Sequence, residues 1–416
     1  MAHIDQTLLI ALKGYAWLPD LRRRTNGRPV PIRVMGQRAV AIGGPEAVRF
    51  FYADGNLERH SALPHPVVAT LFGRGAVHTL DGPAHRHRKA MFVDLLMGDG
   101  IDRLAGLAEE EFEVAARRWR GGPEFSLFDE TARIIATAVT RWTGVPETQS
   151  DLDALPADLI AMVDGFATLG PRHAWALAAR RRRERWLAGI IENVRRGGAP
   201  RSPLTSIAHH SEDGRLLDSR TAAVEVLNII RPATAVTWLV AFAAHALDQW
   251  PRLRSEMESV DYARAFAHEV RRFYPFAPFL GGRATRDLRF QDANIAAGTL
   301  VLLDVYGQHH DGRVWPEPYT FRPERFLGRP IGEFELIPQG GGDPRTGHRC
   351  PGEQITVALL SILSQKLAAL DYHLPPQRTG IDLSRIPALP RDGIRVIVPA
   401  RQATSSPSRS PGPGGR

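Results

Sequence analysis

Hydrophobic residues recur along most of this chain with the spacing of an amphipathic helix. Apolar positions three and four residues apart predict helices that bury one face. The stretches with this character cover residues 105–120, 128–143, 220–247, 262–273 and 355–370.

A few shorter segments have the apolar and β-branched character of strands. Two of them flank a short turn and predict a hairpin, and three more form a second group in the last third of the chain. They are residues 31–34 and 39–42, then residues 283–285, 288–290 and 299–303. The pattern therefore predicts a mainly α fold with small β-sheets.

The composition adds a prediction about domains. The 416 residues are 43% hydrophobic and 24% charged, which is normal for a globular protein. No linker-like stretch occurs before about residue 400, so we predict a single domain over residues 1–400. Residues 401–416 are rich in Pro, Gly and Ser without apolar periodicity, which predicts a disordered tail.

Arginine dominates the positive charge, and the formal net charge is +8. Dense runs occur at residues 22–24 and 180–183, but neither is interleaved with aromatic residues. We therefore predict solvated faces and no nucleic-acid partner. The N-terminus has no basic leader before an apolar core, and no uninterrupted apolar stretch has membrane-spanning length. These features predict a cytoplasmic protein without a membrane anchor.

The only cysteine, Cys350, lies in a glycine-rich loop that leads into a predicted helix. A lone buried cysteine is usually an inert small hydrophobe. Here His348 and Arg349 flank it, and Pro351 would open the helix and leave backbone N–H groups facing the sulfur, which favours the thiolate. One thiolate without a CxxC pair or a second ligand cluster argues against zinc and iron–sulfur centres and for haem iron.

A second feature is a pair of opposite charges one helical turn apart. Glu269 and Arg272 can pair on one helix face, which by itself is typical of an ordinary solvated ion pair. Arg325 from a later segment could complete a clamp of two guanidinium groups on one carboxylate. We predict a scaffold role for these residues.

These segments resemble the cytochrome P-450 superfamily. The cysteine loop is similar to the family's ligand loop, Glu269-Val-Arg-Arg272 matches its Glu-x-x-Arg pair, and residues 311–326 end in the similar sequence Pro-Glu-Arg-Phe. The resemblance covers roughly the last third of the chain. It implies the P-450 fold, with haem b between the long central helix and the cysteine loop, and with Cys350 as axial ligand to the iron. It also implies that His348, Arg349 and Gly352 contact the cofactor.

The predicted central helix contains Arg231-Pro232, where most oxygen-activating relatives have an acid followed by an alcohol. An interior proline kinks a helix. An interior arginine among apolar residues requires an anion, unless it reaches the surface by snorkelling. Arg-Pro at this place, with the lengthened cysteine loop, resembles the hydrogen-peroxide-using fatty-acid branch of the superfamily.

That resemblance implies a catalytic use of the substrate itself. Cleavage of a peroxide O–O bond requires a proton to move between the two oxygens, and Arg231-Pro232 supplies no acid–base side chain at this place in the helix. If Arg231 binds the substrate carboxylate, that carboxylate can carry the proton, and the carbons next to it are held at the oxidant.

Further pocket residues are predicted from the segment at 71–89. By resemblance His78 occupies the distal position that is glutamine in hydroxylating members and histidine in some decarboxylating ones, and Phe72 lines the pocket. A histidine can donate a proton near physiological pH, whereas glutamine cannot. The alternative is a structural histidine. Phe166 and Phe279 are also expected to line the substrate pocket.

Basic residues in the same region are candidates for the haem propionates. His85 and Lys89 lie four apart on one predicted helical face and match such positions in the family, and Arg59 could join them. The alternative is a solvated basic face.

The resemblance implies a haem-thiolate peroxygenase that uses hydrogen peroxide to hydroxylate long-chain fatty acids at the α or β carbon, with decarboxylation to terminal alkenes as a further outcome. No redox partner would be obligatory. Three alternatives stay open: a reductase-dependent monooxygenase, a hydroperoxide-rearranging haem isomerase and a non-enzymatic haem sensor.

Overall fold

The computed structural model describes residues 5–62, 64–146, 148–166, 168, 170–197 and 200–400. Within these residues the chain is mainly helical with small sheets, so the predicted fold class is confirmed. The predicted tail at residues 401–416 lies outside the described residues.

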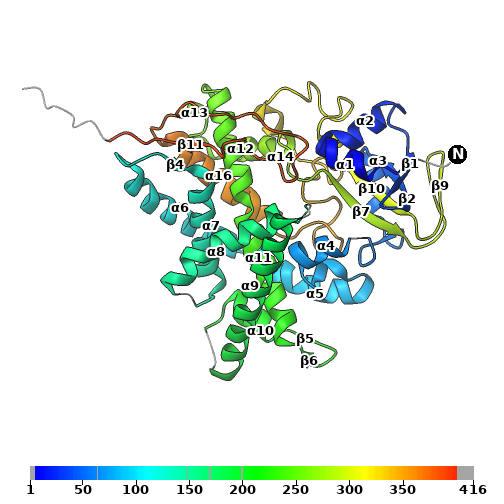
Figure 1. The fold of residues 1–416 in the computed structure, drawn as a ribbon, viewed down its shortest axis with the longest axis horizontal. Helices are drawn as coiled ribbons and strands as arrows, with labels where there is room; N and C mark the ends of the chain where they lie inside the picture. Colours follow the sequence, from blue (N-terminus) through cyan, green and yellow to red (C-terminus); the bar gives the residue numbers. More distant parts are fainter. Residues whose placement is uncertain are drawn as a thin grey trace, which may run out of the picture.

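Helices make up most of the structure, and the strands of the main sheet gather near the N-terminus (Figure 1). The helices are α1 (Thr7–Lys13), η1 (Gly14–Ala16), α2 (Trp17–Arg23), α3 (Pro45–Tyr52), α4 (His65–Val67), η2 (Val68–Phe72), η3 (Val77–Thr79), α5 (Gly82–Leu96), α6 (Gly100–Trp119), α7 (Leu127–Thr143), α8 (Gln149–Asp164), α9 (Pro171–Gly197), α10 (Pro203–Ala208), α11 (Ser219–Thr234), α12 (Val236–Gln249), α13 (Leu253–Glu256), α14 (Val260–Phe273), α15 (Val305–His309), η4 (Pro323–Phe326) and α16 (Glu353–Ala369). The strands are β1 (Val30–Val34), β2 (Gln37–Ile42), β3 (Leu57–Glu58), β4 (Phe125–Ser126), β5 (Ser211–Glu212), β6 (Arg215–Leu216), β7 (Phe279–Ala284), β8 (Leu288–Phe290), β9 (Ala293–Ile295), β10 (Leu300–Asp304) and β11 (Arg395–Val396).

The main sheet has the strand order β1-β2-β10-β7-β3. The predicted hairpin is confirmed as the antiparallel pair β1 and β2, with Ile32 opposite Ala39. Strand β10 pairs in parallel with β2 and antiparallel with β7. All five residues of β10 are buried, because this strand is central and apolar clusters cover both of its faces.

The largest apolar core surrounds α11 and α12, which run through the centre of the molecule (Figure 1). The predicted helix over residues 220–247 is present as these two helices, with a break at Ala235. Pro232 lacks an N–H group and so cannot donate the hydrogen bond that would continue the helix regularly. The combined segment Ser219–Gln249 is long and apolar enough to span a bilayer, but 94% of its most apolar window is buried inside the protein.

The structure buries part of each of the two arginine runs, which the sequence analysis predicted to face solvent. Arg22 is 5% exposed and its Nη1 lies 2.9 Å from Asp304 Oδ2, while Arg180 and Arg183 in α9 are 1% and 4% exposed. The prediction of solvated faces is therefore wrong for these three residues. Residues three apart lie on nearly the same face of a helix, so only part of such a run can face solvent.

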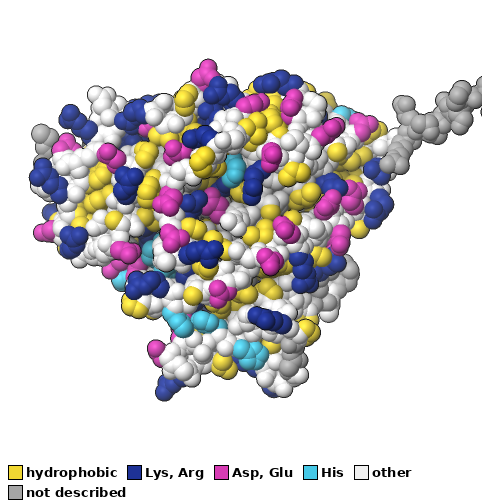
Figure 2. Space-filling view, turned by 180° about the vertical axis from the view of Figure 1, so that it is seen from behind, with side chains coloured by type: hydrophobic (Ala, Val, Ile, Leu, Met, Phe, Trp, Pro, Cys, Tyr) yellow, Lys and Arg dark blue, Asp and Glu magenta, His cyan; other side chains and the backbone are white. Residues whose placement is uncertain are grey.

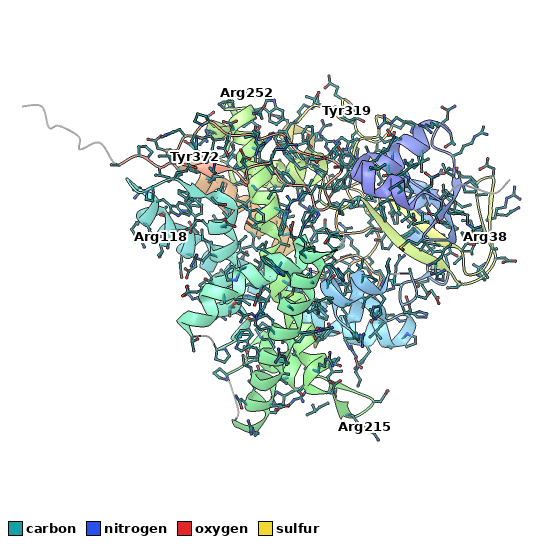
Figure 3. All side chains as sticks on the ribbon, viewed as in Figure 1. Arg38, Arg118, Arg215, Arg252, Tyr319 and Tyr372 are labelled. Carbon is teal, nitrogen blue, oxygen red and sulfur yellow. The ribbon has the colours of Figure 1, made fainter. Side chains whose placement is uncertain are left out.

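The remaining positive charge is spread over the surface. Arg38, Arg118 and Arg215 are exposed and lie at widely separated edges of the molecule (Figure 3). On the face drawn in Figure 2, Lys and Arg side chains alternate with Asp and Glu and form no continuous basic stripe. The absence of a nucleic-acid partner stays a prediction.

Candidate active site

The cysteine loop folds tightly between α3 and the start of α16. The backbone N–H of Cys350 donates to the carbonyl oxygen of Gln339 at 3.0 Å, which closes the loop. Gly340 has φ +99°, and a Cβ atom there would lie 2.6 Å from Tyr52 Oη, so the close packing of the loop requires glycine. Helix α16 begins at Glu353 with Gly352 as its N-cap, so the expectation that Pro351 opens the helix is wrong.

The charges around Cys350 also differ from the sequence-based expectation. Arg349 Nε pairs with Glu353 Oε2 at 2.7 Å, and Glu353 pairs with Arg271 as well. Burial raises the pKa of the Cys350 thiol, and the Glu353 carboxylate adds to this effect. The Gly352 N–H group, Lys89 and Arg271 oppose it. The flanking cations therefore do not by themselves produce a thiolate, because burial dominates and Arg349 is already paired.

Glu269 in α14 pairs with two arginines. Arg272 Nε lies 2.7 Å and Arg325 Nε 3.2 Å from Glu269 Oε2, and the backbone N–H of Arg322 donates to Glu269 Oε1 at 2.8 Å. Glu269 and Arg272 are both completely buried, so the pair is not an ordinary solvated one. The contacts join α14 to η4, and a scaffold role for the three charged residues stays our proposal.

Arg231 is a buried cation without a balancing anion among the described residues. It is 5% exposed, which rules out snorkelling to the surface. Its Nε has no hydrogen-bond partner, and no carboxylate among the described residues pairs with it. Burial lowers the pKa of Arg231 to about 9, and Arg180 contributes to this shift, so the side chain is still charged at pH 7. A buried charge of this kind favours the binding of an anion.

Asn228 is a polar residue of this helix that the sequence analysis did not select. Its Oδ1 is buried without a partner, while its amide donates to Glu225 Oε2 at 3.1 Å. The detectable signal was its place in α11 one turn before Arg231. His78 Nδ1 is likewise buried without a partner. Unsatisfied buried polar atoms are costly and call for a further partner.

His78 lies in η3, next to Phe72. The two ring centroids are 4.5 Å apart, and Val77 beside it donates its N–H to Glu225 Oε1 at 2.8 Å. Burial first, and then the positive charge of Arg231, lower the pKa of His78 to about 3. The expectation that His78 exchanges a proton near physiological pH is therefore wrong for the substrate-free protein, because its imidazole is neutral there.

The basic residues expected at the haem propionates are buried, and two of them, His85 and Lys89, contact the cysteine loop. His85 stacks on His348 at 3.9 Å, and Lys89 Nζ donates to the carbonyl oxygens of Arg349, at 2.5 Å, and Gly347. His85, Lys89 and Arg59 are at most 8% exposed, so the alternative of a solvated basic face is wrong. Burial lowers the pKa of Lys89 to about 8. Their contact with propionates stays a prediction.

The two remaining aromatic candidates lie in different parts of the fold. Phe279 begins β7, and its ring meets that of Trp17 edge to face at 5.8 Å. Phe166 follows the end of α8 and is partly buried. Their contact with substrate stays a prediction.

The donor set around the sulfur is compatible with a haem. Among the described residues, no group of three or more His, Cys, Asp and Glu side chains could hold a metal ion. Cys350 is the chain's only thiol, so it suits a metal that brings its other ligands in a macrocycle. The unpartnered polar atoms of Arg231 and His78 indicate that this part of the protein meets a further molecule.

Comparison with known proteins agrees with this geometry. A sequence model of the cytochrome P-450 family matches residues 252–385, the part that contains Glu269, Arg272 and Cys350. Cytochrome P-450 139 from Mycobacterium tuberculosis is 25% identical over 400 residues, which cover 86% of this chain and 90% of the relative.

Solved structures show a greater similarity. Cytochrome P450SP alpha, in complex with (R)-ibuprophen, is 36% identical with a TM-score of 0.92 over 95% of this chain and 98% of its own. The chain belongs to the cytochrome P-450 family, in its fatty-acid peroxygenase branch.

Two other P-450 structures are nearly as similar. Ligand-free cytochrome P-450 OleT is 35% identical with a TM-score of 0.91, over 94% of this chain and 96% of its own. Cytochrome P450EX alpha with myristic acid is 34% identical with a TM-score of 0.90, over 95% and 97%. Family membership implies a haem, and the predicted family and enzyme class are confirmed.

Proposed function

We propose that this protein uses hydrogen peroxide to hydroxylate long-chain fatty acids at the α or β carbon, with decarboxylation to terminal alkenes as a further outcome. The observation that carries the proposal is the buried, unpaired guanidinium of Arg231 on the central helix. A fatty-acid carboxylate is an anion that this group can bind with two parallel hydrogen bonds.

Arg231 would perform two tasks in this reaction. It would hold the carboxylate at a fixed place, so that the carbons next to it always occupy the reacting position. The bound carboxylate would also be the acid–base group that takes a proton from one oxygen of hydrogen peroxide and returns it to the other. The cofactor, when bound, supplies the oxidising chemistry. Its ligand from the protein would be Cys350, while His85, Lys89, Arg59, His348, Arg349 and Gly352 would hold the macrocycle.

The substrate, the cofactor and the oxidant are proposed from related proteins in the same branch of the family. The related OleT and P450EX alpha structures contain arachidonic acid and myristic acid, which supports a long-chain fatty acid as substrate. We propose haem b as the cofactor, hydrogen peroxide as the oxidant without an obligatory redox partner, and a cytoplasmic location. We also propose that residues 1–400 form one catalytic domain.

Product analysis tests the proposal. Purified protein loaded with haem is given hydrogen peroxide and saturated fatty acids of different chain lengths, with the matching fatty alcohols as controls. We expect α- and β-hydroxy acids and terminal alkenes from the acids, and no oxidation of the alcohols, because they lack the carboxylate. Turnover only with a reductase system would favour the monooxygenase alternative, and no turnover at all would favour a haem sensor.

His78 gives a prediction about the product ratio. In the substrate-free protein burial, and after it the charge of Arg231, keep this imidazole neutral, and a bound carboxylate would offset the second of these effects. His78 could then exchange a proton next to the reacting carbons, whereas glutamine cannot. His78→Gln is expected to lower the ratio of alkene to hydroxy acid while total turnover stays within about tenfold. The ratio is measured by gas chromatography, and an unchanged ratio with intact substrate affinity would indicate a purely structural histidine.

A further inference from the structure

Arg180 in α9 contacts the segment that carries Phe72, and the proposed function gives it no part. It is 1% exposed, and its Nε pairs with Glu184 Oε1 at 2.7 Å one turn later in the helix. This ion pair turns the guanidinium fork away from solvent and fixes its orientation. Helix α9 packs against both η2 and α11, the helix that carries Arg231 (Figure 1).

The other nitrogens of Arg180 bind the end of η2. Nη1 donates to the carbonyl oxygen of Leu71 at 2.8 Å and Nη2 to that of Phe72 at 2.7 Å, with a longer contact from Nη1 to Thr70 at 3.4 Å. The last carbonyl groups of a helix have no partner within the helix, and a cation there also meets the negative end of its dipole. Arg180 therefore acts as a side-chain cap for a segment more than a hundred residues away.

The chain directly after η2 is shaped around this guanidinium. Gly73 has φ +88°, and a Cβ atom there would lie 2.2 Å from Arg180 Nη2 and 2.8 Å from Val224 Cγ1. Only glycine can therefore follow Phe72 while Arg180 keeps its place. The same turn leads to η3, where His78 lies beside the Phe72 ring.

We propose that Arg180 is a positioning residue of the active site: by capping η2 it holds Phe72 against His78 and so determines how the substrate chain lies next to the carboxylate. This inference rests on the proposed function for the identity of the substrate. Arg180 also adds positive potential near Arg231 and His78, which strengthens the attraction of the site for a carboxylate.

A double-mutant cycle tests the proposal. Arg180→Gln is expected to lower kcat/KM for peroxide-driven fatty-acid oxidation at least tenfold, while the thiolate-haem absorption of the ferrous carbon monoxide complex persists. If Arg180 acts through Phe72, the same change in a Phe72→Ala background should cost less than threefold, because the ring that it positions is already absent. Equal losses in both backgrounds would overturn the proposal.

Two further variants distinguish the positioning of Phe72 by Arg180 from a general loss of folding and from the loss of a positive charge. Arg183→Gln is the matched control, since Arg183 is on the same helix, is 4% exposed and pairs with Asp158 Oδ2 at 2.7 Å. It should leave kcat/KM within threefold. Arg180→Lys keeps the charge but cannot bridge the carbonyl groups of Leu71 and Phe72 while pairing with Glu184, so it should lose activity too. Wild-type kcat/KM in Arg180→Lys would overturn the proposal, and this variant decides the matter if Arg180→Gln does not fold.

Hydrogen exchange provides a readout that does not depend on turnover. Peptides that cover residues 66–80 should exchange faster in Arg180→Lys than in wild type, and at the wild-type rate in Arg183→Gln. Unchanged exchange in Arg180→Lys would overturn the proposal. If exchange is faster in Arg180→Lys but the wild-type protein oxidises no fatty acid, the proposed function is contradicted. The capping of η2 by Arg180 would still be established.

Discussion

Arg231→Ala should abolish peroxide-driven oxidation of fatty acids while haem is still bound. The buried guanidinium has no anion among the described residues, so the substrate carboxylate is its expected partner. Loss of a buried charge pair costs about 3–5 kcal/mol, which corresponds to a decrease in kcat/KM of roughly a hundredfold to several thousandfold. The measurement is kcat/KM with hydrogen peroxide and a fatty acid, alongside the spectrum of the ferrous carbon monoxide complex.

A second readout distinguishes this role from a structural one. An unpaired buried charge destabilises a folded protein, so its removal should not lower stability in the absence of substrate. Arg231→Leu, which leaves less of a cavity than alanine, should unfold at or above the wild-type temperature. Arg231→Lys should retain part of the activity, because it keeps the charge without the fork. Normal turnover of fatty acids by Arg231→Ala would contradict the substrate-assisted mechanism.

Cys350→Ala should lose both the thiolate-haem absorption signature and all peroxide-driven turnover. Cys350 is the chain's only cysteine, and no other group of metal-ligating side chains occurs among the described residues. A thiolate ligand donates electron density to iron and favours O–O cleavage, and alanine offers no ligand atom. The absorption spectrum of the reduced, carbon monoxide-bound protein is the measurement.

Comparison of a serine variant with the alanine variant shows whether the effect comes from the sulfur atom. Cys350→Ser keeps nearly the same volume but replaces sulfur with oxygen, so it should lose the signature as completely as alanine does. The effect would then belong to the sulfur and not to packing of the loop. Persistence of the wild-type spectrum in either variant would show that Cys350 is not the axial ligand.

Local patterns in the sequence accounted for most of the elements. The periodicity of residues 262–273 predicted α14, and the alternation at residues 31–42 predicted the β1–β2 hairpin. Helix α9 was not predicted as a helix, because its arginine-rich middle was interpreted as a solvated charge run. Helical periodicity can be recognised from residues that are three or four positions apart. The partner of a buried charge can come from any part of the chain and cannot be recognised in this way.

In the candidate site, the residues could be identified from the sequence, but their protonation states could not. Cys350, Arg231 and the Glu269–Arg272 pair were identified from residue type, local context and resemblance to the family's motifs. The neutral state of His78 could not be predicted, since it depends on burial and on Arg231, which is far away in sequence. The thiol pKa of Cys350 likewise depends on its burial, and on Lys89 and Arg271, which are far away in sequence.

The sequence by itself determined the helical fold class through its periodicity, and the family through its resemblance to the cysteine loop and the Glu-x-x-Arg pair. It also determined the chemical type of the site through a lone thiol and an arginine in an apolar helix. All of these are local properties of the sequence. Only the tertiary structure decided which charges are buried and what they meet. Arg22 pairs with Asp304, and Arg180 donates to the carbonyl groups at the end of η2. In both cases the partner lies in a distant segment of the chain. Desolvation and electrostatic energies depend on distance in space and not on separation along the chain, so they exist only once the chain has folded.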